Sequence, residues 1–148
     1  MKTVLVTGSS SGLGKSIIEK YASMGYNTII TYNNNMDAAE KLNSYIREKY
    51  KVNSEFYKLD ITDEESINSL VTSLKKEYSN IDVLVNNAGI ALDNLYTNKS
   101  KSEFLKVVTT NLVGTFLVTK AFSSWMYECK TGVIINISSN NSIDSYYS

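Results

Sequence analysis

The stretch Thr7-Gly8-Ser9-Ser10-Ser11-Gly12-Leu13-Gly14 decides the fold of this chain. It follows a short apolar run, Thr3–Val6, and opens a segment with the periodicity of an amphipathic helix, Gly12–Met24. Glycines at such a place permit the tight turn from strand to helix, let a pyrophosphate approach the backbone and let the helix pack close to the sheet. The N–H groups and the positive dipole end of the helix then favour phosphates. The stretch therefore predicts a strand–loop–helix unit that binds a dinucleotide.

Strand and helix patterns alternate along the rest of the chain. The predicted strands are Thr3–Thr7, Thr28–Tyr32, Ser54–Leu59, Asp82–Val85 and Gly132–Ile137. The predicted helices are Gly12–Met24, Asp37–Tyr50, a helix that starts after Thr62, and a long helix over Lys101–Glu128. This alternation predicts parallel strands with right-handed crossovers, and hence one Rossmann-type, doubly wound α/β/α domain over residues 1–148 with strand order 3-2-1-4-5. Ligands bind such sheets where the winding reverses, here between the first and fourth strands.

Two local patterns refine this prediction. Thr62-Asp63-Glu64-Glu65 fits a capping box, in which the Thr62 hydroxyl and the Glu65 carboxylate each accept a backbone N–H of the other residue. Asn111 falls inside the long helix with apolar neighbours such as Val108 and Leu112, where an amide side chain is costly unless it is hydrogen-bonded. From the residues alone, Asn111 is either a satisfied core polar residue, a helix kink or a functional group.

Composition excludes several classes of function. The formal net charge is +0 and the pI about 6.3, so no excess of basic charge points to nucleic acid or to an anionic membrane. The chain has no histidine, which removes His-based catalysis and His metal ligands, and we expect no metal site. Its single cysteine, Cys129, cannot form an internal disulfide. Together with the lack of a signal-peptide pattern, this favours a cytoplasmic protein.

The glycine-rich stretch is not a P-loop, because the spacing from the earlier glycines to Gly14-Lys15-Ser16 does not fit that motif. Four more signatures follow it in order: Asp60 after the third strand, Asn86-Asn87-Ala88-Gly89 after the fourth, Asn111, and Ser138-Ser139 after the fifth. With these motifs the whole chain resembles the short-chain dehydrogenase/reductase family, and within it the 3-oxoacyl-[acyl carrier protein] reductases. The resemblance implies transfer of a hydride from NADPH to a carbonyl. The expected reaction is the reduction of a 3-oxoacyl thioester to the 3-hydroxyacyl product.

The same resemblance implies roles for individual residues. Asp60 would accept a hydrogen bond from the adenine amino group, with Ile61 packed beside the ring. Asn111 would hold a water in the proton relay, and Ser139 (or Ser138 in its place) would orient the substrate carbonyl. The phosphates would be held by Gly8, Ser10, Ser11, Gly12, Leu13 and Gly14, and the ribose and nicotinamide side would be lined by Asn87, Ala88 and Gly89. Without the resemblance, Asp60 could simply cap a strand end, and the asparagines and serines could serve turns.

The choice of cofactor depends on the end of the second strand. An acidic residue there binds the ribose 2′-hydroxyl of NAD and repels a 2′-phosphate. This chain has Tyr32, Asn33 and Asn34, which remove that acidic selector and offer neutral donors. No Lys or Arg lies among them, and Ser11 stands at a loop position that is often basic in NADP-preferring members of the family. We therefore expect NADPH, with NADH the less favoured cofactor.

One family element is missing after Ser139. The family uses a Tyr-x-x-x-Lys pair, in which the lysine lowers the pKa of the tyrosine that acts as general acid. The tyrosines that follow Ser139 are Tyr146 and Tyr147, and neither has a residue four positions later. We interpret the chain as the N-terminal part of a reductase. By itself this part would be inactive, and the full-length protein would form a homodimer or homotetramer through the long helix around Asn111. The alternatives are NAD(P)-dependent oxidation of a secondary alcohol or sugar, and a non-catalytic dinucleotide-binding module.

Overall fold

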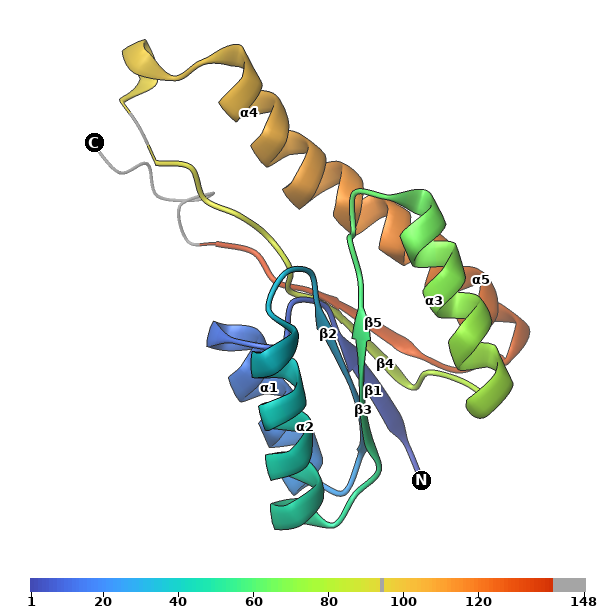
Figure 1. Cartoon of the computed structure of the whole chain (residues 1–148). Helices are drawn as coiled ribbons and strands as arrows, with labels where there is room; N and C mark the ends of the chain where they lie inside the picture. Colours follow the sequence, from blue (N-terminus) through green and yellow to red (C-terminus); the bar gives the residue numbers. More distant parts are fainter. Residues whose placement is uncertain (94, 140–148) are drawn as a thin grey trace.

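A computed structural model describes residues 1–93 and 95–139 of the chain (Figure 1). The strands are β1 (Thr3–Val6), β2 (Asn27–Tyr32), β3 (Ser54–Lys58), β4 (Val83–Asn86) and β5 (Val133–Asn136). The helices are α1 (Gly12–Ser23), α2 (Met36–Tyr50), α3 (Glu64–Glu77), a short 3₁₀ turn (Tyr96–Asn98), α4 (Lys101–Val108), a π-helical segment (Thr109–Gly114) and α5 (Thr115–Glu128). The strands form one parallel sheet of order β3-β2-β1-β4-β5, which confirms the predicted doubly wound α/β/α fold.

Each face of the sheet has its own apolar core because side chains alternate along a strand. On β1, Val4 and Val6 pack with Ile18 of α1 and Ile46 of α2, and all four are fully buried. Leu5 points to the other face and joins the cluster beneath α3 and α5. Figure 1 shows this division, with α1 and α2 on one side of the sheet and α3 and α5 on the other. The two layers hold the carboxyl ends of the strands at one edge.

The start of α3 differs from the predicted capping box. Asp63, not Thr62, is the N-cap, and its carboxylate accepts from the Glu65 N–H at 3.0 Å. Thr62 instead donates both its N–H and its hydroxyl to Asp60 Oδ1, at 2.9 and 2.7 Å. A carboxylate is a stronger acceptor than a peptide or hydroxyl oxygen, so Asp60 draws Thr62 back toward the strand end. A full capping box does occur at α4, between Ser100 and Glu103.

The predicted long helix Lys101–Glu128 is not uniform. Its α-helical turns α4 and α5 are joined by the π-helical segment Thr109–Gly114, which contains Asn111. Such wide turns are rare and commonly occur at functional sites. Gly114 ends the segment directly against Ile61, since a Cβ added there would lie 2.9 Å from that side chain. In the described part of the chain, no helix is long and apolar enough to span a membrane.

Candidate functional site

The glycine-rich loop and the loop after β4 meet at the carboxyl edge of the sheet. β1 is paired on both sides, with Val6 opposite Ile30 of β2 and opposite Val85 of β4. The three strands therefore end level with one another, and the chain leaves all of them at the same edge. This is the point where the winding reverses, as the alternation of elements predicted.

Thr7 fastens these two loops together. Its hydroxyl oxygen, in a side chain that is 2% exposed, accepts the backbone N–H groups of Asn87 and Ala88, both at 2.9 Å. In return, Asn87 Nδ2 donates to the carbonyls of Thr7 and Gly8 at 2.9 and 3.4 Å. The loops are thus fixed to each other by partly buried hydrogen bonds, which gives them one geometry.

A second set of hydrogen bonds ties the glycine-rich loop to β2. The Ser9 hydroxyl donates to the Val6 carbonyl at 2.8 Å and accepts the Thr31 N–H at 3.0 Å. The Gly8 N–H donates to the Thr31 hydroxyl at 3.0 Å. Ser9 is fully buried and Thr31 nearly so. The loop is therefore held from both neighbouring strands before any ligand arrives.

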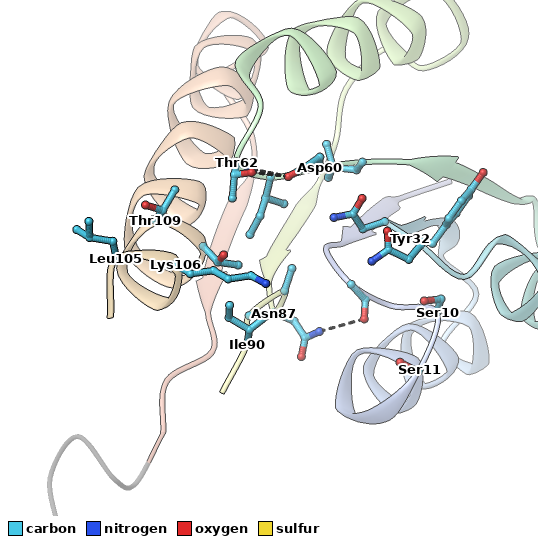
Figure 2. A pocket seen from close by; sticks show the side chains of 18 residues that line it. Ser10, Ser11, Tyr32, Asp60, Thr62, Asn87, Ile90, Leu105, Lys106 and Thr109 are labelled. Atoms are coloured by element: carbon cyan, nitrogen blue, oxygen red, sulfur yellow. Dashed lines mark hydrogen bonds between the residues drawn. The ribbon is translucent and has the colours of Figure 1, made fainter. Parts of the chain in front are cut away.

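These loops form one wall of a cavity of about 790 Å³, which lies within the usual size range of ligand pockets (Figure 2). Lys106 extends across it from α4, and Tyr32 lies on the opposite side. Among the described residues that line the cavity, Asp60 and Lys106 are the charged ones. The lining includes these residues that we assigned to a cofactor from the sequence: Gly8, Ser10, Ser11, Tyr32, Asn33, Asn34, Asp60, Ile61, Asn87, Ala88 and Gly89.

The first turn of α1 borders the cavity without lining it. Gly12 has φ +56°, and a Cβ built there would meet no atom within 4 Å, so the backbone is open to a close approach. A Cβ at Gly14 would instead lie 2.5 Å from Asn87 Nδ2 and 2.7 Å from the Gly8 carbonyl oxygen. Gly14 therefore lets the helix pack against the loops, as predicted, while Leu13 is 58% exposed. Direct contact of Gly12, Leu13 and Gly14 with phosphates stays a prediction.

Asp60 lies at the far side of the cavity, after β3. Its hydrogen bonds from Thr62 hold the pKa of its carboxyl below the ordinary value, so the group is ionised at neutral pH. The Ser66 hydroxyl accepts the Asp60 N–H at 3.0 Å, which fixes the backbone as well. Asp60 thus shapes the turn into α3, the plain role that the sequence left open, and also presents a fixed acceptor to the cavity.

Asn111 is hydrogen-bonded, as its place in a helix required, but it is not in the core. Its side chain accepts the Ile90 N–H and donates to the Ile90 carbonyl, both at 2.9 Å, and the residue is exposed. Neighbouring Leu112 is 68% exposed, so the apolar residues around Asn111 do not bury it. Asn111 does not line the cavity; it positions Ile90, which does. Its proposed part in a proton relay is not tested by these contacts.

Ser138 and Ser139 follow β5 at the same edge of the sheet. The Ile137 N–H donates to the Asn86 carbonyl at 2.9 Å, which extends the β4–β5 pairing to Ile137, directly before Ser138. Both serines are exposed, and neither is among the residues that line the cavity. A catalytic role for Ser138 or Ser139 stays a prediction, as does the choice between them. Tyr146 and Tyr147 lie outside the described residues.

The sequence does contain one Tyr-x-x-x-Lys, Tyr45 to Lys49, on α2. The Lys49 ammonium donates to the Tyr45 hydroxyl, and this hydrogen bond raises the pKa of Lys49. Neither residue lines the cavity, and both are exposed. This pair therefore lies on α2, outside the cavity.

Sequence reasoning missed Thr7, Ile90, Lys106 and Thr110 as parts of the site. Thr7 was quoted in the motif but given no role, although a hydroxyl at the end of an apolar strand already called for a polar partner. Lys106 of α4 and Thr110 of the π-helical segment are four residues apart in the chain, and both line the cavity. Polar residues at this spacing, beside the apolar Leu105, Val107 and Val108, were the available signal.

Comparisons with known proteins agree with this geometry. The family model described as "short chain dehydrogenase" matches residues 2–148. The chain is 40% identical over 138 residues to the 3-oxoacyl-[acyl-carrier-protein] reductase FabG of Aquifex aeolicus, covering 93% of this chain and 55% of the relative. It is 34% identical over 146 residues to an NADP-dependent 3-hydroxy acid dehydrogenase of Schizosaccharomyces pombe, covering 98% and 56%.

Solved structures give the same picture. "ElxO with NADP Bound" superimposes with a TM-score of 0.88 at 36% identity, over 98% of this chain and 58% of the other. NAD⁺-bound xylitol dehydrogenase gives 0.92 at 30% identity, over 98% and 55%. The chain thus spans about half the length of the relatives it matches.

Proposed function

Because the chain belongs to the short-chain dehydrogenase family, we propose that it binds a nicotinamide dinucleotide, NADPH before NADH, in the cavity at the carboxyl edge of the sheet. In the whole protein the reaction is reduction of a carbonyl, a 3-oxoacyl thioester to the 3-hydroxyacyl product. The observation that carries the proposal is the pair of loops fastened by Thr7, which faces Asp60 across one cavity. The names of the relatives, a FabG and a hydroxy acid dehydrogenase, support the substrate class.

The described residues fit such a cofactor. The open backbone at Gly12 and the N-terminus of α1 suit a pyrophosphate, with Ser10 and Ser11 beside it. Asp60 offers an ionised acceptor to the adenine amino group, and Asn87 with Ala88 forms the wall toward the nicotinamide. When bound, the reduced nicotinamide supplies a hydride. Asn111 and Ser139 act in this proposal as the water-holding and carbonyl-orienting groups that the family resemblance implies.

The first experiment is a fluorescence titration with NADPH and NADH on the wild-type protein, Gly12→Asp and Gly12→Asn. Asp and Asn both tolerate the positive φ of +56° and enter open space, so each variant is expected to fold. Gly12→Asp places a carboxylate where the phosphates bind and should weaken binding about tenfold more than Gly12→Asn does. Unchanged affinity in Gly12→Asp would remove the glycine-rich loop from the site.

A second assay addresses the reaction. The 148 residues by themselves should bind NADPH without reducing acetoacetyl thioesters, because no Tyr-x-x-x-Lys follows Ser139 in them. Measurable turnover by this chain alone would contradict the proposed division of roles. Binding of NAD⁺ in preference to NADPH would favour the alternative, oxidation of an alcohol or sugar, as the name of the xylitol dehydrogenase suggests.

We also propose that the protein assembles as a homodimer or homotetramer through the helices around Asn111. Large apolar side chains are exposed along α4, the π-helical segment and α5: Phe104, Leu112, Val113 and Phe116 are each at least 40% exposed. Several large exposed apolar side chains along one stretch of helix are typical of an interface. A second copy of the same surface would cover it about a twofold axis.

A further inference from the structure

A groove between α1 and α2 adjoins the dinucleotide cavity. The two hollows share Ser10, which lines both of them. The groove, about 590 Å³ in volume, is lined on the α1 side by Lys15 and Glu19 and on the α2 side by Lys41 and Tyr45. A ligand that occupies the cavity beside Ser10 therefore has a way to extend a polar group between these two helices.

The groove carries a positive charge that is not neutralised within it. Lys15 and Glu19 form an ion pair at 3.8 Å on neighbouring turns of α1. The ion pairs of the described residues do not include Lys41. Lys41 also lines a second groove on α2, together with Asp37 and Glu40. In the first groove, the Lys41 ammonium is thus a positive charge that forms no ion pair with a described carboxylate.

The cavity itself lacks a cation where NADPH differs from NADH. Tyr32 ends β2 and Asn33 and Asn34 follow it; all three are neutral, and so is Ser11. The next residue, Asn35, is used by the fold, because its side chain accepts the Ala38 N–H at 3.0 Å and caps α2. Lys106 is a cation of the cavity, but it comes from α4. A phosphate on the adenosine ribose needs a positive charge close to the end of β2.

We propose that Ser10 and Lys41 form the subsite for the 2′-phosphate of NADPH, with the Ser10 hydroxyl as hydrogen-bond donor and the Lys41 ammonium as counter-charge. This inference rests on the proposed function and adds the residue that selects between the two cofactors. Glu19 opposes the selection, since it holds Lys15 and adds a negative charge to the groove. The selectivity is consequently modest and depends on salt.

The test is a titration of NADPH and NADH with the wild-type protein, Lys41→Met and Arg47→Met. Arg47 is an exposed cation of the same helix that lines neither groove, so Arg47→Met matches the change in net charge. Lys41→Met should raise the dissociation constant of NADPH about fivefold, as expected for one exposed cation–phosphate contact, and leave that of NADH within about twofold. Glu19→Gln should strengthen NADPH binding and leave NADH binding unchanged. The dissociation constant of adenosine 2′-monophosphate, a fragment of NADPH, should change in the same direction as that of NADPH in each variant.

The outcomes separate this inference from the proposed function. A wild-type protein that binds neither dinucleotide contradicts both. A wild-type protein that binds NADPH, with Lys41→Met unaffected or with equal losses for NADPH and NADH, overturns the subsite alone. A selective loss of NADPH in Lys106→Met but not in Lys41→Met also overturns it, because the selecting charge would then come from α4. Circular dichroism spectra that match the wild type show that a variant is folded.

Discussion

Replacing Thr7 by Val tests whether its hydroxyl fastens the two loops of the site. Valine has nearly the shape of threonine and suits a strand end, so the change removes the hydroxyl with little change in packing. Two backbone N–H groups, those of Asn87 and Ala88, then lose their acceptor, which lay at 2.9 Å from each. The donation to the Val85 carbonyl is long, 3.4 Å, and adds little.

The magnitude follows from these two donors. A buried donor that loses its partner costs about 1–3 kcal/mol, and both loops are half-buried, so we expect the low end for each. The free energy of unfolding should fall by about 2–3 kcal/mol in total. With an m-value of about 1–3 kcal/mol/M, the urea midpoint should fall by about 1 M or more. NADPH affinity should fall as well, because the Asn87–Gly89 wall is no longer fixed to the glycine-rich loop.

Urea unfolding followed by circular dichroism measures the effect, with Thr3→Val as the matched control. Thr3 is on the same strand and 4% exposed, and among the described residues its hydroxyl has no hydrogen bond. Thr3→Val should change the free energy of unfolding by less than about 0.5 kcal/mol. If Thr7→Val cost no more than the control, the hydroxyl would not hold the loops, and the fixed geometry argued for the site would be wrong.

Two further predictions concern charge and assembly. Asp60→Asn should lower the free energy of unfolding by about 0.5 kcal/mol at pH 7, because a neutral amide oxygen accepts from Thr62 less strongly than a carboxylate. The pKa of Asp60 is lowered in the folded protein, so its contribution is present above the unfolded pKa of about 4 and is lost as the pH falls through the folded value. Urea unfolding between pH 7 and pH 3.5 checks this, and a difference that grew on acidification would contradict it. Phe116→Glu should convert a homo-oligomer into monomers in sedimentation velocity, while Tyr127→Glu, at a residue 86% exposed at the far end of α5, should not. A wild-type protein that sediments as a monomer would refute the interface.

Much of the fold followed from local patterns, and the errors came where two local patterns competed. Thr62 matched the capping box in sequence. In the structure it donates instead to the Asp60 carboxylate, two residues earlier, and Asp63 is the N-cap of α3. The sequence predicted that Asn111 needs hydrogen-bond partners. The residues of the helix could not identify that partner as Ile90, which is 21 positions away. Contacts of that range depend on how the loops are placed, and that placement is not encoded in the spacing of one helix.

The sequence by itself determined the order of the strands, the position of the switch point and the residue types around it. Those features follow from periodicities of two and 3.6 residues, from glycines and from turn chemistry, all of which act between near neighbours. The tertiary structure alone decided that the Thr7 hydroxyl joins the loops, that Gly14 is needed for the approach of Asn87, and that Lys41 adjoins the cavity through Ser10. These are contacts between segments distant in the chain, and they exist only after burial of the two cores has brought the carboxyl ends of the strands together.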